Sequence, residues 1–152
     1  MTETEILTAI IDRMATVNGL NYSDEDWGQL DEYSPSFPVK WPCGLADIES
    51  VNYSDIGMDK TALPINRQEG NYIITISIAN LKLSNTSKRA PETQKQNAWS
   101  LHNLIEDVHK VIHGFKPHEK SGKLVRVSKR RIKRDDGVQL YKVSYSMGAH
   151  NV

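Results

Sequence analysis

The segment of residues 71–83, NYIITISIANLKL, constrains the fold of this chain more than any other. It is rich in β-branched residues and is bounded by Glu69-Gly70 and Ser84-Asn85, which is the pattern of a β-strand. Alternation along a strand divides its side chains between two faces, with Ile74, Ile76 and Ile78 on one and Ile73, Thr75, Ser77 and Ala79 on the other. We therefore expect a central strand of a sheet, covered more fully on one side than on the other.

Two segments with helical periodicity are candidates for the covering layer. In residues 3–18, Thr2 and Glu5 fit a capping box, and the apolar stripe consists of Ile6, Ile10, Met14 and Val17, widened by Leu7 and Ile11. The second helix is predicted to begin after Pro91 and to end at His113-Gly114, with a stripe of Ala98, Leu101, Ile105, Val108 and Ile112. Both patterns predict amphipathic helices that bury one face against the sheet.

The remaining regular segments are predicted strands. Residues 45–53, LADIESVNY, form one of them, and residues 54–69 are expected to be a polar connection. Residues 123–147 contain two runs joined through Arg134-Asp135-Asp136-Gly137, and Asp-Gly is a strong signal for a β-hairpin turn. In this hairpin Val125 and Val127 alternate with Arg126 and Ser128, and the second arm has an apolar face of Tyr141, Val143, Tyr145 and Met147.

The predicted fold is therefore α+β, with the element order α-β-β-α-β-β. It consists of a mostly antiparallel sheet of about four strands packed against two helices. A length of 152 residues suits a single domain, so we assign residues 1–152 to one domain.

Residues 21–44 differ in character from the rest of the chain. The segment is acidic and contains three prolines, which oppose regular structure, so we predict a loop. Four aromatic side chains spread along it favour contact with another surface, and they are Trp27, Tyr33, Phe37 and Trp41. The loop either closes over the core of its own chain or reaches a partner as an arm, and both interpretations stay open.

Charge is distributed unevenly along the chain. Residues 1–60 contain 12 Asp and Glu against three Lys and Arg, a net charge of −9, and the remainder contains 16 Lys and Arg against seven Asp and Glu, a net charge of +9. The most concentrated basic run lies in the predicted hairpin and consists of Lys129, Arg130, Arg131, Lys133 and Arg134. Three interpretations of this run stay open: protection of an edge strand, an interface with protein, or a nonspecific contact with nucleic acid phosphates.

The sequence contains no G-x-S-x-G, P-loop, G-x-G-x-x-G or H-E-x-x-H motif. His102, His109 and His113 lie on the second predicted helix, and the last two are four residues apart, a spacing that suits one metal. Only Glu106 adds a ligand nearby, and di-metal bundles need such a motif twice. Cys43 stands alone and fits an ordinary thiol. We expect a protein without catalytic activity, metal or cofactor.

No stretch approaches the roughly 18 consecutive apolar residues of a membrane span, so we expect no membrane contact. The N-terminus, MTETEILTAI, is acidic, unlike the start of a secretory signal. We expect the chain to stay in the cytoplasm while it assembles.

The order of these elements resembles phage and prophage tail terminator proteins, which are also called tail-completion proteins. The resemblance covers residues 1–18 and 43–148, through the leading helix, the Pro-containing entry into residues 45–53 and the isoleucine-rich strand. The second helix of that family ends near a short Leu/Ile-His-Gly turn, and Ile112-His113-Gly114 matches it. The run SGKLVRVSKRRIKRDDGVQLYKVSYSM is similar to the closing hairpin of the family, whereas residues 21–44 are longer than its pattern.

The resemblance implies a structural protein that oligomerises into a ring, commonly hexameric, that caps the tail tube. Its partners would be copies of itself, the tail-tube protein and the head-tail connector, and its final location would be the virion tail. Interface residues are then expected among the aromatic loop residues and the basic run. The alternative is a nucleic-acid-binding accessory protein that uses residues 129–134.

Overall fold

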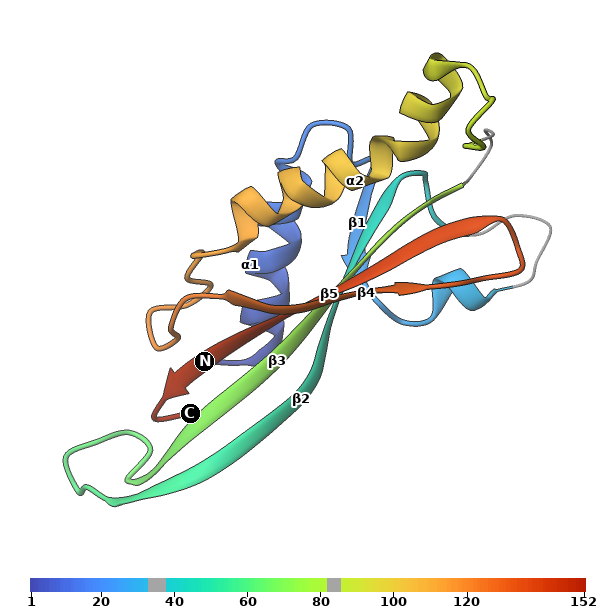
Figure 1. Cartoon of the computed structure of the whole chain (residues 1–152). Helices are drawn as coiled ribbons and strands as arrows, with labels where there is room; N and C mark the ends of the chain where they lie inside the picture. The colour runs from blue at the N-terminus through green and yellow to red at the C-terminus, as the bar shows by residue number, and fades with distance from the viewer. Residues whose placement is uncertain (33–37, 82–85) are drawn as a thin grey trace.

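A computed structural model of the chain describes residues 1–32, 38–81 and 86–152. The elements in chain order are α1 (Glu3–Ala15), β1 (Tyr22–Glu25), the 3-10 helix η1 (Gln29–Asp31), β2 (Cys43–Met58), β3 (Asn66–Leu81), α2 (Glu92–Ile112), β4 (Val125–Ile132) and β5 (Val138–His150) (Figure 1). The sheet has the strand order β1-β2-β3-β5-β4, in which only the β1-β2 pair is parallel. The predicted α+β class is confirmed, with five strands among the described residues in place of about four.

Strand β1 lies in the segment for which the sequence predicted no regular structure. Its residues Tyr22–Glu25 pair with Cys43–Ala46 of β2, and η1 follows shortly after it. The prediction was wrong here because the prolines of the segment all follow residue 34, so residues 22–25 keep the backbone N–H groups that a strand needs. Gly19, with a φ of +90°, allows the chain to reverse between α1 and β1.

Strand β3 is the centre of the sheet, as predicted, with β2 and β5 on its two sides. Ile74, Ile76 and Ile78 are fully buried and share one core cluster with residues of both helices. Figure 1 shows the two helices on the same side of the sheet. Side chains on the other face are also buried near the end of the strand, because Ala79 packs in a second cluster with Leu30 and Leu45.

Both predicted helices are confirmed. In α1 the Glu5 amide donates to the Thr2 hydroxyl at 3.2 Å, and the Thr2 amide donates to the Glu5 carboxylate at 2.7 Å, which completes the capping box. The predicted stripes are buried in both helices, and α2 adds Leu104 to its stripe. In the ranges that the structure describes, neither helix is long and apolar enough to cross a membrane.

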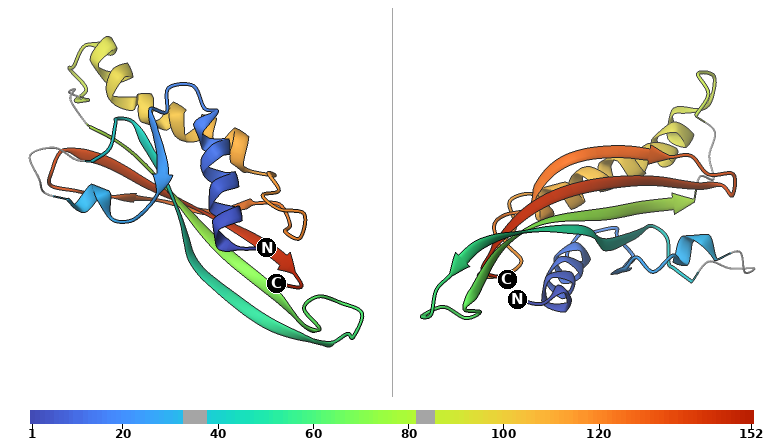
Figure 2. Two further views of the ribbon diagram at one scale, coloured as in Figure 1. Left: turned by 180° about the vertical axis from the view of Figure 1, so that it is seen from behind. Right: turned by 90° about the horizontal axis from the view of Figure 1, so that it is seen from below.

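The hairpin of β2 and β3 is longer than predicted. Residues 54–69, expected to be a polar connection, contain the end of β2, the start of β3 and the turn between them. The pairing with β5 ends at Glu69, so the tip of the hairpin extends beyond the rest of the sheet in both views of Figure 2. Met58 and Leu63 near this tip are 66% and 81% exposed. The sequence did not reveal these strand ends because their side chains are mostly polar. A two-stranded projection has no core against which apolar side chains could be buried.

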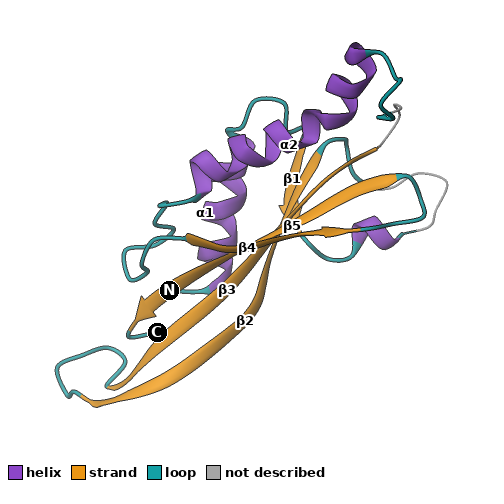
Figure 3. Cartoon of the chain, in the orientation of Figure 1, coloured by secondary structure: helices purple, strands orange, loops and turns teal. Residues whose placement is uncertain are grey.

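The C-terminal hairpin is confirmed, and its predicted apolar face lies in the main core cluster. Gly137, with a φ of +79°, occupies the turn. Val125 and Val127 are exposed, because β4 is an edge strand with a register shift between Arg126 and Ser128. Figure 3 shows β4 at the opposite margin of the sheet from β1.

We predict that Ile76→Ala lowers the free energy of unfolding by about 2–5 kcal/mol, because it leaves a cavity beneath both helices. Ile65→Ala is the matched control, since Ile65 is 44% exposed near the hairpin tip and should change stability by less than about 1 kcal/mol. Urea unfolding followed by circular dichroism measures both values. Equal losses for the two variants would contradict the assignment of β3 as the central buried strand.

Candidate functional site

The basic run that the sequence singled out is divided between two faces of the edge strand β4. Lys129 is opposite Val143 and Arg131 is opposite Tyr141, so both lie on the face that carries the helices. Arg130 is opposite Lys142 on the other face. Lys129 and Arg131 approach the Tyr141 ring, with distances to its centroid of 5.5 Å and 6.0 Å. These three basic side chains are exposed, whereas Arg126, the fourth basic residue of β4, is half-buried with its guanidinium 3.4 Å from the Glu106 carboxylate.

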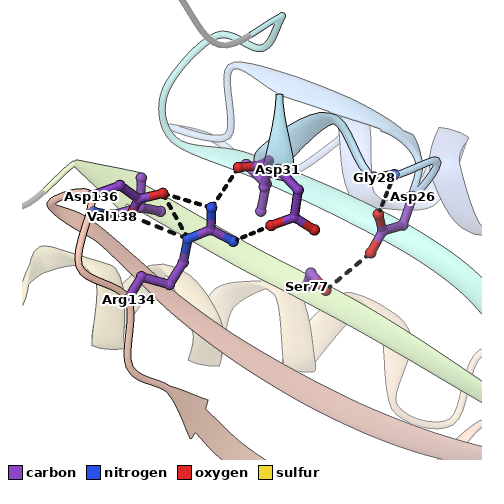
Figure 4. A network of polar contacts seen from close by, with 8 residues as sticks. Asp26, Gly28, Asp31, Ser77, Arg134, Asp136 and Val138 are labelled. Atoms are coloured by element: carbon purple, nitrogen blue, oxygen red, sulfur yellow. Dashed lines mark hydrogen bonds and ion pairs between the residues drawn. The ribbon is translucent and has the colours of Figure 1, made fainter. Parts of the chain in front are cut away.

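Arg134, the last residue of the run, is instead engaged inside the molecule (Figure 4). Its guanidinium donates to Asp136 at 2.6 Å and to Asp31 at 2.9 Å, and also to the carbonyl oxygen of Leu30. Its side chain is 12% exposed. Hydrogen bonds from Arg134 are the main reason that the pKa of Asp136 is lowered. Arg134 thus ties η1 to the turn of the β4-β5 hairpin, and Lys133 beside it stays exposed.

The aromatic residues of the 21–44 segment have different environments. Trp41 is half-buried and packs against the second core cluster, whose members include Leu30 and Val138. Trp27 is 55% exposed. Tyr33 and Phe37 lie outside the described residues. Trp41 therefore fits the interpretation of a loop that closes over its own core, and Trp27 is the described aromatic residue of this loop that faces solvent.

The histidines of α2 make contacts within the fold. Nδ1 of His109 lies 3.2 Å from the Tyr145 hydroxyl, and Nδ1 of His113 accepts a hydrogen bond from the Arg126 amide at 3.2 Å. Burial, followed by the charge of Arg126, lowers the pKa of His109. His102 packs edge-on against Tyr141. Within residues 1–32, 38–81 and 86–152, no group of three or more His, Cys, Asp or Glu side chains has the arrangement of a metal site.

Two further features carry little chemistry. Cys43 is buried, and desolvation raises the pKa of its thiol to about 12, so the thiol stays protonated and unreactive at neutral pH. An open hollow of about 850 Å³ lies beside the base of the β2-β3 hairpin. Its His150 and Glu69 side chains approach to 3.5 Å, but both are more than half exposed, so water weakens their interaction.

An acidic group that sequence analysis missed lies at the edge of the sheet opposite β4. Asp26 follows β1, and Asp47 and Glu49 belong to β2. The Asp26 amide donates to the Ala46 carbonyl at 2.8 Å, which places Asp26 beside Asp47, and burial, then the charges of Asp26 and Glu49, raise the pKa of Asp47. The excess of negative charge in residues 1–60 was visible in the sequence, but the pairing of β1 with β2 was not, and that pairing gathers these side chains.

We predict that Arg134→Ala lowers the free energy of unfolding by about 2 kcal/mol, because Asp136 and the Leu30 carbonyl lose a charged donor in a poorly solvated place. Lys133→Ala, a change of an exposed neighbour, should stay within about 0.5 kcal/mol. The folded-state pKa of Asp136 lies below its unfolded value, so the stabilisation is present above the unfolded pKa and disappears as pH falls through the folded pKa. Urea unfolding at pH 7 and in acid measures this, and the difference between the two variants should narrow in acid, where the bond from Arg134 to the Leu30 carbonyl persists.

Comparison with known proteins finds a match for the fold but none for the sequence. No family model matches the chain, and no curated protein matches it. Among solved structures, the fold is similar to that of a chain from the virion of a native gene transfer agent (GTA) particle, with a TM-score of 0.57. The likeness covers 95% of this chain and 94% of that chain, at 9% sequence identity. The arrangement of strands and helices described above is therefore shared, over nearly its full length, with a chain of a virion.

Proposed function

We propose that this chain is a structural protein of a phage-like virion, and specifically a tail terminator that assembles into a ring and caps the tail tube. The observation that carries the proposal is the fold likeness to a chain of the gene transfer agent virion, which includes nearly the whole of both chains. The resemblance to tail terminators, based on the Ile112-His113-Gly114 turn and the closing hairpin, points the same way. The likeness supports a virion component, and the resemblance supplies the finer assignment.

The proposed mechanism is assembly by complementary surfaces, without a catalysed reaction. The exposed residues Lys129, Arg130 and Arg131 of β4, with Lys133 and Trp27, are the predicted contacts that the structure leaves at the surface. Arg134 and Trp41 stabilise the subunit itself. The projecting β2-β3 hairpin, with Met58 and Leu63 exposed near its tip, adds an apolar surface that suits burial in an assembly. Neighbouring subunits, tail-tube protein and head-tail connector are the proposed partners in the virion tail.

We predict that the full-length protein forms a closed oligomer of defined size, alone or when tail-tube protein of the same particle is added. Light scattering coupled to gel filtration over a hundredfold range of concentration measures the mass, and electron microscopy shows whether the oligomer is a ring at the end of a tube. A chain that stays monomeric throughout and leaves tube length unchanged would contradict the proposal.

The second candidate function is nucleic-acid binding through β4. Lys129, Arg130 and Arg131 are exposed next to Lys142, which concentrates positive charge at one edge of the sheet. With Arg134 engaged internally, four basic residues of the run remain exposed, Lys133 included, so the logarithm of affinity should fall with the logarithm of salt concentration with a slope of about −3.6. Gel shifts with duplex DNA between about 50 and 200 mM salt test this, and the absence of a shift at 50 mM would exclude this function.

A further inference from the structure

We propose that the two edges of the sheet are the two halves of one head-to-tail contact between copies of this chain. In this contact the basic edge β4 of one copy lies against the acidic edge of β1 and β2 of the next. The inference rests on the proposed assembly into a ring and deepens it by assigning the surfaces that meet.

The first half of the contact is the outer side of β4. Among the described residues, no strand pairs with this side, because β4 is the last strand of the sheet. Arg130 projects on one face and Lys129 and Arg131 on the other, so positive charge lines the edge on both faces. Val125 and Val127, at the start of the same strand, are about half exposed. Near the start of this edge the Arg126 amide is bonded to His113, and no described strand pairs with the part that follows. An edge strand of this kind, with exposed valines, is a surface that can pair with another strand.

The second half is the outer side of β2 beyond its short pairing with β1. That pairing ends at Glu25 and Ala46, and no described strand pairs with the outer side of residues 47–58. Asp47 and Glu49 lie in this stretch, and Glu49 accepts a hydrogen bond from the Thr75 hydroxyl of β3. Asp26 lies beside them and accepts a bond from the Ser77 hydroxyl at 3.5 Å, as Figure 4 shows. These bonds hold the carboxylates near the edge.

Acidic and apolar residues occur together on this second edge, as basic and apolar residues do on the first. Glu25 and Glu49 are exposed, and farther along β2 Tyr53 and Met58 are 54% and 66% exposed. The two edges therefore have opposite charge and the same combination of ionic and apolar contacts. The 12 residues of 47–58 are also long enough to receive the eight residues of β4.

The charges select one mode of association. Two β4 edges would bring Arg130 and Arg131 of both copies together, and two β2 edges would bring together the carboxylates, so both symmetric pairings are opposed by repulsion. Only unlike edges attract, and a contact between unlike surfaces forms rings when its rotation closes. Strand direction agrees, because β4 runs antiparallel to β2 within the sheet, so β4 of one copy beside β2 of the next continues the antiparallel alternation.

Charge reversal on one edge at a time tests the contact. Arg130→Glu with Arg131→Glu makes both edges acidic, and Glu25→Lys with Glu49→Lys makes both edges basic; all four side chains are exposed. Each pair should raise the protein concentration needed for assembly at least tenfold. All four changes in one chain exchange the two charges and should restore assembly, as should an equimolar mixture of the two pairs in a ring with an even number of subunits.

The matched control is Lys88→Glu with Arg89→Glu, which changes net charge by the same amount at an adjacent pair of exposed basic residues before α2. It should assemble like the unchanged protein. Far-ultraviolet circular dichroism and urea midpoints verify that every variant folds, and light scattering measures mass.

Several outcomes would overturn the proposal. Assembly of either single-edge variant at the unchanged concentration would overturn it, as would a folded four-residue variant that stays monomeric. An unchanged protein that never assembles would instead show that the proposed ring itself is wrong, which separates the two failures.

Discussion

Burial of the isoleucine face of β3 beneath two helices is the interaction on which the rest of the structure depends. Ile74, Ile76 and Ile78 are fully buried and belong to one core cluster with the stripes of α1 and α2. This layer orients β3, and β3 in turn orders β2 and β5 on its two sides. The helices α1 and α2 cover one face of the sheet, no described strand pairs with the outer side of β4 or of β2 beyond Ala46, and these two margins carry the charges of the proposed contact.

The second core cluster explains why Arg134 has a different role from the other residues of the basic run. η1 and Trp41 cover one end of the opposite face, and Arg134 secures this cover through Asp31, Asp136 and a backbone carbonyl. Because Asp31 and Asp136 neutralise the charge of Arg134 within the chain, Arg134 contributes little to the electrostatic potential at the surface. Lys129, Arg130 and Arg131, three to five residues away, form no ion pair with a carboxylate of the described residues and are exposed, so their charge is available for the proposed contact.

The proposed role as a virion component depends on repeated contacts between copies, and it would give a use to surface features that favour aggregation of an isolated protein. Long unpaired edges and an apolar hairpin tip promote association. In the proposed contact, opposite charges on the two edges would restrict association to one orientation, whereas His102, His109, His113 and Cys43 make their contacts within the fold. The shared architecture with a gene transfer agent virion chain fits this view.

The sequence by itself determined the two helices, the central strand, the closing hairpin and the α+β class, because each depends on local periodicity, capping or turn chemistry that neighbouring residues specify. It did not reveal β1 or the full length of the β2-β3 hairpin, since polar strands give little periodic signal. Tertiary structure alone decided that Arg134 and Trp41 belong to the subunit while Lys129, Arg130 and Arg131 remain outside it. It also decided that Asp26, Asp47 and Glu49 meet at one edge, because strand pairing joins residues more than 20 positions apart and no local rule encodes that pairing.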